Sequence, residues 1–305
     1  MSARLPPYIA VAFAACAWGT WGLVIRQADA LGPGTPVALQ STLVMAILTV
    51  VSGLGSIRDR SPGRASWRTR GWVAWLGVGD AMNVLLFFSA YKLTIAVSVL
   101  THYLAPVLVA VAAPFVLRER MTARTAVATA TSFAGLAVML VPSTTGEDAT
   151  SAWTSALLGS GSAAFYASNV IVNKLVAREM STSETMFWHG VVATPLLAAF
   201  VPRDAWGRLD TQAALFLSVV SIGPGALAGL AFVWGLRRIP AAHASTLTLL
   251  EPLVSILLGA ATLGEHLRIA TALGGALILT GSLVVMTQPP PAAPVGAPRS
   301  TDRGT

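Results

Sequence analysis

Two carboxyl groups stand in stretches of sequence that are otherwise apolar. Asp80 lies in "GVGDAMNVLLFF", and Glu251 lies in "TLLEPLVSILLGAA", directly before Pro252. Each stretch predicts a membrane helix, and an acidic side chain at the centre of a bilayer costs about 2.5 to 3.5 kcal/mol. A carboxylate at that depth should face a cavity, where it can bind a proton or a cation. The alternatives are a structural hydrogen bond between helices for Asp80, and stabilisation of the proline bend for Glu251.

Polar side chains fall close to these carboxyl groups in the sequence. Asn83 follows Asp80 at i+3, on the same face of the predicted helix. His102 precedes Pro106 in another apolar stretch, where a histidine can bind a proton or donate a hydrogen bond to a substrate. A packing role with satisfied hydrogen bonds is the alternative for His102.

A polar stripe and an aromatic residue extend this set of candidates. Tyr166, Asn169 and Asn173 recur at i, i+3 and i+7 of one predicted helix, and Trp18 lies in the first. Together they could line a central amphiphilic pocket. The alternatives are that Trp and Tyr anchor the membrane interface and that the asparagines join helices by hydrogen bonds.

The elements that must position these residues are membrane helices. Of the 305 residues, 54% are hydrophobic and only 11% are charged, whereas soluble domains carry about 25% charged residues. Apolar runs of about 20 residues suffice to span a bilayer as helices. Hydropathy predicts ten spans, near residues 7–26, 35–56, 71–91, 95–117, 122–142, 153–174, 185–201, 212–235, 240–263 and 268–287.

Some residues receive expectations from their place in these spans. His189 and His243 lie close to span ends, so we expect them at the membrane interface. Glu119 and Glu265 fall in turns, where each can cap the next helix. Cys16 is the one cysteine, which excludes an internal disulfide, and in its apolar helix it is expected to be a small core residue.

The distribution of positive charge predicts the orientation. With the N-terminus in the cytoplasm, 15 of the 20 Lys and Arg residues lie inside, and the outside retains Arg26, Lys92, Arg203, Arg208 and Arg268. The positive-inside rule therefore favours both termini in the cytoplasm, which requires an even number of spans. This asymmetry also explains the net charge of +7 without a nucleic-acid partner.

The chain contains an internal repeat. An offset of 146 residues aligns 96–141 with 242–287 without a gap and gives 10 identities in 46 positions. The identities include Pro106 with Pro252 and Glu119 with Glu265. Each repeat holds five spans, an odd number, so the second copy must enter the membrane from the opposite side. Inverted repeats are the architecture of many secondary transporters, whose substrate sites lie near the midplane.

The repeated motifs resemble those of the EamA family of the drug/metabolite transporter superfamily. They are "AWGTWG" near the start, then "LAPVLVAVAAPFVLRER" with "GLAVML" and "LEPLVSILLGAATLGEHL" with "GSLVVM". The resemblance implies a ten-helix carrier built from two such domains, with a role in export or uptake. The family's substrates vary among amino acids, metabolites and drugs, and similar Glu-Pro pairs in many of its sequences suggest a shared role for Glu251.

These observations predict an all-α integral membrane protein of ten transmembrane helices arranged as two inverted five-helix repeats. The expected units are 1–145, 146–287 and a disordered, Pro/Ala-rich cytoplasmic tail at 288–305. The chain carries no Walker A, H-E-x-x-H or C-x-x-C motif, so we expect no cofactor and no ATP-driven step.

The predicted function is secondary transport of a small metabolite, amino acid or drug-like molecule by alternating access. We expect an exporter in the inner membrane, in contact with lipid and coupled to a proton or another cation. One alternative is an intramembrane enzyme that uses Asp80 and Glu251 as an acid/base pair, and another is a passive channel. The sequence leaves open whether the chain works as a monomer or an oligomer.

Overall fold

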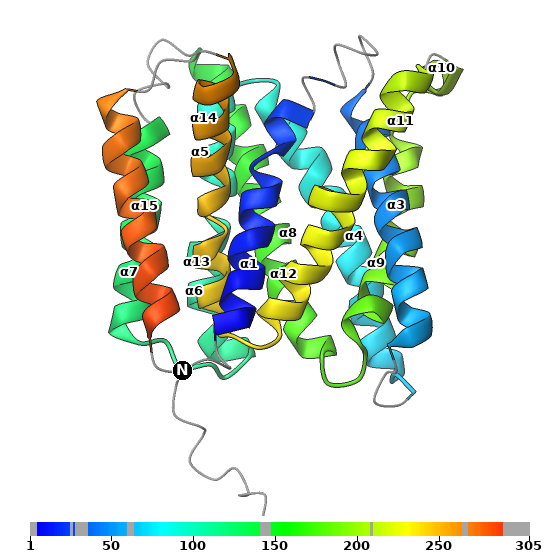
Figure 1. Ribbon diagram of the computed structural model, residues 1–305, viewed down its shortest axis with the longest axis horizontal. Coiled ribbons are helices and arrows are strands. Elements are labelled where there is room, and N and C mark those ends of the chain that lie inside the picture. Colours follow the sequence, from blue (N-terminus) through cyan, green and yellow to red (C-terminus); the bar gives the residue numbers. More distant parts are fainter. Residues whose placement is uncertain are drawn as a thin grey trace, which may run out of the picture.

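The chain forms a bundle of long helices (Figure 1). The computed structural model describes residues 5–24, 27, 36–59, 64–140, 148–207, 210–263 and 268–288. Within these ranges every regular element is a helix. The predicted tail beyond 288 and the loop residues Arg26 and Glu265 lie outside the described residues.

The helices of the first half follow the predicted spans. The first span runs from Leu5 to Val24, and most of it is helix α1. The bounds are α1 Leu5–Trp18, α3 Val37–Arg58, α4 Trp67–Tyr91, α5 Ile95–His102, α6 Ala105–Val116 and α7 Ala123–Leu140. The fourth span therefore consists of two short helices, α5 and α6, instead of one.

The second half repeats this order. Its bounds are α8 Ala149–Val176, α9 Thr182–Ala199, α10 Arg203–Gly207, α11 Thr211–Val220, η3 Ser221–Leu227, α12 Ala228–Leu236, α13 Ala241–Leu247, α14 Leu250–Leu263 and α15 Ile269–Thr287. Its third span is helical throughout but contains a π-helical segment, η3, around Pro224, a residue that cannot donate the regular helical hydrogen bond. Its fourth span is again two helices, α13 and α14.

Nine of the helical runs in the described part of the chain are long and apolar enough to cross a membrane. The predicted span that is not one of these nine is 185–201. It corresponds to α9, which has 18 residues but includes Glu184 and His189. Helix α9 packs against both α3 and α4. The predicted class of a ten-helix membrane protein is thereby confirmed, and the predicted ends differ from the observed ones by about one helical turn at most.

Helix starts are marked by side-chain caps. Ser66 accepts from the N–H of Thr69 before α4, and Ser181 accepts from that of Glu184 before α9. Asp148 accepts from the N–H of Ser151 at 2.8 Å before α8, and this hydrogen bond lowers the pKa of Asp148. These caps satisfy N–H groups that have no partner within their own helix.

Equivalent helices of the two halves pack against each other in antiparallel pairs. Helix α7 lies beside α15, and as numbers rise along α7 they fall along its partner: Ala128 meets Gly281, and Gly135 meets Gly274. Helices α3 and α9 meet in the same way, with Thr49 at Gly190 and Gly53 at Phe187.

The first span of each half packs against the third span of the other half. Helix α1 pairs with α12, where Trp18 lies against Phe232, and α4 pairs with α8, where Asn83 lies against Ser162. Two inverted five-helix repeats require this crossed, antiparallel arrangement.

Both described ends of the chain lie at one end of the bundle (Figure 1). Near the start of α1, Tyr8 bonds to His243, and Thr125 bonds both to His243 and to Gln288, just past α15. We call this the clamped end.

The expectation that Cys16 is a small core residue is wrong. Cys16 is exposed, because it lies on the outer face of α1.

Candidate functional site

The fourth span of each half is broken by a proline, and the two prolines occupy equivalent positions of the repeats. Pro106 has no N–H to donate to the carbonyl of His102, and Pro252 has none for that of Thr248. The breaks, between α5 and α6 and between α13 and α14, fall within a residue of the same repeat position. Since α6 also packs against α13, the breaks bring polar groups of both repeats close together at mid-height of the bundle (Figure 1).

Glu251 lies at the second break and interacts with the first. Its carboxyl group is hydrogen-bonded to the hydroxyl of Tyr103, the residue between α5 and α6. No Lys, Arg or His side chain forms an ion pair with Glu251 within the described residues. A carboxylate in this setting carries a proton or binds a cationic group.

His102, next to Tyr103 in the sequence, lies in a chain of hydrogen bonds. The single hydroxyl proton of Ser162 goes to Oδ1 of Asn83, at 2.7 Å. Nδ1 of His102, 2.8 Å from the Ser162 oxygen, therefore donates to it, which leaves Nε2 of His102 as an acceptor. The predicted residues Asn83 and His102 thus meet through Ser162, which the sequence analysis did not single out.

Aromatic rings surround His102. The ring centroids of Phe87, Tyr103 and Tyr166 lie 4.6, 5.1 and 5.6 Å from that of His102. The hydroxyl of Tyr166 is hydrogen-bonded to Thr248 at the second break. We call Tyr103, His102, Tyr166 and Glu251 the central cluster.

Trp18 lies close to the same break. Its ring centroid is 5.0 Å from that of Phe232 on α12. The next residue, Gly19, lies against the carbonyl of Glu251, where a Cβ would come within 2.7 Å of that oxygen. The end of α1 therefore approaches the start of α14 closely, and Trp18 is the residue before this contact.

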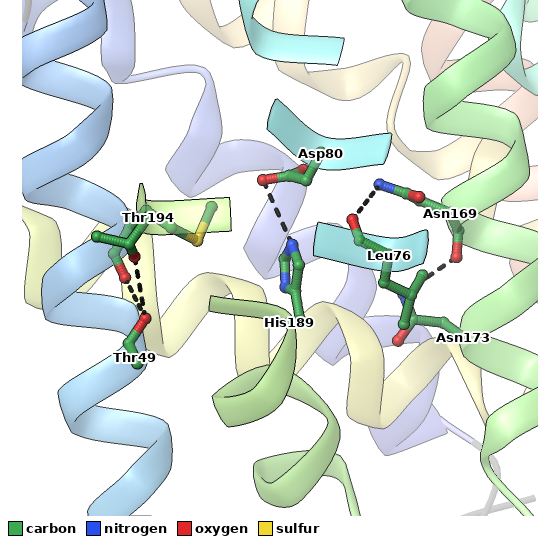
Figure 2. A network of polar contacts seen from close by, with 8 residues as sticks. Thr49, Leu76, Asp80, Asn169, Asn173, His189 and Thr194 are labelled. Atoms are coloured by element: carbon green, nitrogen blue, oxygen red, sulfur yellow. Dashed lines mark hydrogen bonds and ion pairs between the residues drawn. The ribbon is translucent and has the colours of Figure 1, made fainter. Parts of the chain in front are cut away.

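Asp80 belongs to a different cluster (Figure 2). Its Oδ2 lies 3.5 Å from Nε2 of His189 on α9. Asp80 and Asn83 were predicted to share one face, but Asp80 faces α9 whereas Asn83 faces α8. His189 and His243 were expected in wet positions near span ends, but both side chains are buried, at 7% and 3% exposure. His243 does lie near the start of α13.

Asn169 and Asn173 join helices in this region (Figure 2). Nδ2 of Asn169 donates to the carbonyl of Leu76 on α4 at 3.4 Å, and Nδ2 of Asn173 donates to the carbonyl of Asn169 at 3.0 Å. The predicted stripe on α8 is therefore divided, since Tyr166 joins the central cluster and the two asparagines do not.

The clamped end is held by polar contacts between the repeats. Glu119 pairs with Lys174, and its other carboxylate oxygen accepts from the N–H of Ala241 at 2.6 Å. Glu119 was expected to cap the next helix, α7, but it caps α13 of the other repeat. Glu179 accepts from the N–H of Ser66 at 2.7 Å, a bond that lowers the pKa of Glu179.

The opposite end holds a cavity of about 240 Å³. It is lined by the start of α3, the second half of α4 and the residues that follow α9, with Val84, Phe88, Ser89, Lys92 and Phe200 among its residues. Most described Lys and Arg residues lie at the clamped end, while Lys92, Arg203 and Arg268 lie at the cavity end. Within the described ranges no three His, Cys, Asp or Glu side chains gather as metal ligands.

The sequence profile of the EamA-like transporter family matches residues 5–141 and again residues 153–287. The chain belongs to the EamA-like transporter family. Two spans of similarity, one for each half, account for the internal repeat, so the chain is a multi-pass membrane transporter built from two EamA repeats.

Two curated relatives and one solved structure are similar to this chain. An uncharacterized transporter of Archaeoglobus fulgidus is 28% identical over 211 residues, which cover 68% of this chain and 74% of the relative. The uncharacterized transporter YwfM of Bacillus subtilis is 29% identical over 297 residues, or 92% and 93%. A crystal structure matches with a TM-score of 0.76 at 21% identity, over 93% of this chain and 99% of its own, which supports the fold.

Proposed function

We propose that this EamA protein is a secondary active transporter that exports a small metabolite, amino acid or drug-like molecule across the cytoplasmic membrane by alternating access. Both termini, and with them the clamped end, lie in the cytoplasm in this proposal, as the positive charges there favour. The family resemblance implies export or uptake, and export is the direction that we propose. The halves 1–145 and 146–287 are the units that move.

One observation carries the proposal: the central cluster lies where two proline-broken helices from opposite repeats meet. Discontinuous helices that carry polar groups at mid-depth are the form of substrate sites in many transporters. The cluster lies between a clamped end, closed by Glu119 and Lys174, and an end that holds a cavity. A conformational exchange between the repeats would reverse which end is open.

The substrate site in this proposal consists of Glu251, His102, Tyr166, Asn83 and Trp18. The carboxylate would hold a polar or cationic group, and the rings would hold an apolar one. Asn169 and Asn173 support the site, because they fix α8 against α4. The structure gives Asp80 and Glu251 different partners, His189 and Tyr103, so no observation favours an enzyme with the two as an acid/base pair.

The test begins with a thermal-shift screen of the purified protein against amino acids, nucleosides, sugars and cationic drugs, since a ligand of the folded state stabilises it. Each hit is then measured in proteoliposome counterflow. We expect saturable exchange of unmodified substrate that Glu251→Gln and Tyr103→Phe reduce.

Matched controls are Glu184→Gln, near the start of α9, and Tyr91→Phe, at the end of α4, which should keep exchange close to that of the unaltered protein. Conversion of the ligand inside the vesicles would overturn the proposal in favour of an enzyme. Flux without saturation would overturn it in favour of a channel.

A further inference from the structure

Close helix packing brings Asp80 and His189 together. A Cβ added at Gly77 of α4 would come within 2.7 Å of the carbonyl of His189 on α9. On the other side of α9, Gly190 lies directly against Thr49 of α3. Helix α9 is therefore held tightly between α3 and α4, and Asp80, one turn beyond Gly77, faces the His189 ring (Figure 2).

The pair is enclosed but not sealed. The His189 side chain is 9% exposed, and that of Asp80 is 24% exposed. Val84, one turn from Asp80 on α4, lines the cavity at the end of the bundle opposite the clamped end. Because Val84 and Asp80 are four residues apart on one helix, water entering the cavity comes within about one helical turn of the carboxylate.

Other ionisable groups around the pair have partners of their own. On α8, Tyr166 bonds to Thr248 and Lys174 pairs with Glu119. On α5, His102 bonds to Ser162. Past α12, Arg237 bonds to Thr185, one turn before His189; burial lowers the pKa of Arg237 to about 10, so it stays charged at neutral pH.

The remaining ionisable side chains on the surrounding helices lie near helix ends. They are Arg58 on α3, with Asp59 beyond it, Arg68, Arg70 and Tyr91 on α4, and Glu184 on α9. Within the described residues, no Lys or Arg side chain forms an ion pair with Asp80. Asp80 and His189 are thus each other's ionic partner.

A carboxylate and an imidazole 3.5 Å apart can together bind one proton, on either group. The pair is neutral overall with the proton and carries one negative charge without it. Charges in a region of low dielectric interact strongly, and the two groups belong to different repeats. Loss or gain of the proton therefore changes the attraction between α4 and α9, and with it the balance between arrangements of the repeats.

We propose that the Asp80–His189 pair is a proton-binding site, separate from the central cluster, and that its protonation drives the movement of the repeats during transport. This inference rests on the proposed transport function and names its coupling ion. The sequence analysis placed His189 at the membrane interface and did not count it among the candidate site residues.

The first test follows the protons themselves and needs no substrate. Acid-minus-neutral infrared difference spectra of the purified protein, with isotope-labelled histidine, should show carboxyl and imidazole bands that change over about pH 5 to 8. Asp80→Asn should remove the carboxyl band and His189→Gln the imidazole band. Each substitution should also alter the other band, because the two groups form one site.

A pair that is only structural would show no change of protonation in this range, and that result would overturn the proposal. The exchanged pair, Asp80→His with His189→Asp, guards against a folding defect because it retains both groups. It should keep both bands and the coupling between them.

The second test measures the effect on conformation. With Cys16 replaced by Ala, Ser89→Cys in the cavity is labelled with a maleimide, and its rate is divided by that of an exposed reference, Arg203→Cys. Between pH 8 and pH 5 the ratio should change about 5-fold or more. In Asp80→Asn and His189→Gln it should be flat.

An unchanged pH response in both variants would refute the coupling role. The two proposals can fail separately. Counterflow that is absent in every variant, with the infrared bands intact, would contradict transport and not the proton site.

Discussion

Lys174 is the residue on which the clamped end most depends, because its ammonium group joins Glu119, the carbonyl of Ile239 and, through Glu119, the first N–H of α13. The Lys174 and Glu119 side chains are 14% and 21% exposed. Removing one partner of such a pair leaves a poorly solvated charge on the other.

Lys174→Met should therefore lower the free energy of unfolding by about 3 to 5 kcal/mol. Adding Glu119→Gln should recover part of that loss, because the unpaired charge is gone. Denaturant unfolding in detergent measures both. The control is Lys92→Met, in the cavity. Lys92 forms no ion pair within the described residues, so the change should alter stability by about 0.5 kcal/mol or less. Equal losses at Lys174 and Lys92 would contradict a role for the pair.

At the residue scale the sequence indicated candidates but not their partners. Glu251 and His102 could be singled out because an ionisable residue in an apolar run is conspicuous. Ser162 and His189 could not, because a serine in a membrane helix is common, and because α9 begins at Thr182 while the predicted span begins at 185. That difference of about one turn moved His189 from the interface into the core.

At the scale of elements, the proline breaks have a consequence for activity. Pro252→Ala supplies an N–H for the carbonyl of Thr248 and favours one continuous helix. Counterflow should fall about tenfold or more, which corresponds to about 1.4 kcal/mol, while thermal stability is kept or raised. Pro114→Ala is the control, because α6 continues through Pro114. Unchanged counterflow in Pro252→Ala would show that the break is not needed.

The contact between α7 and α15 depends on glycine. A Cβ at Gly135 would come within 2.5 Å of the carbonyl of Gly274, and backbone cannot move aside as a flexible side chain can. Gly135→Ala should therefore destabilise the protein by about 1 to 3 kcal/mol. Gly71→Ala on α4, where a Cβ meets open space, should be neutral or slightly stabilising. Matching melting temperatures for the two variants would exclude tight packing at this contact.

The sequence predicted the elements well because the length of an apolar run and the charged residues at its ends can be read locally in the sequence. It also marked the repeat through shared residues such as Pro106 and Pro252. It did not predict that both fourth spans divide into two helices, since a proline can kink a helix without ending it. Nor did it place Glu119 at α13, because that contact joins residues 122 positions apart.

For the molecule as a whole, the proposed orientation can be tested by labelling. In a Cys16→Ala background, single cysteines replace Arg64, Arg178 and Lys92. A maleimide that does not cross membranes should label only the Lys92→Cys variant in intact cells, because the other two lie at the clamped end. After permeabilisation all three should react. Labelling of Arg64→Cys and Lys92→Cys from the same side would contradict the orientation.

The antiparallel meeting of equivalent helices has an energetic consequence. If the repeats exchange roles during transport, the inward-facing and outward-facing forms would be isoenergetic for a chain with two identical halves. Only positions at which the halves differ, such as His102 opposite Thr248, can bias the resting population. A substitution that traps the carrier in one form should therefore be compensated by the corresponding change 146 residues along the chain.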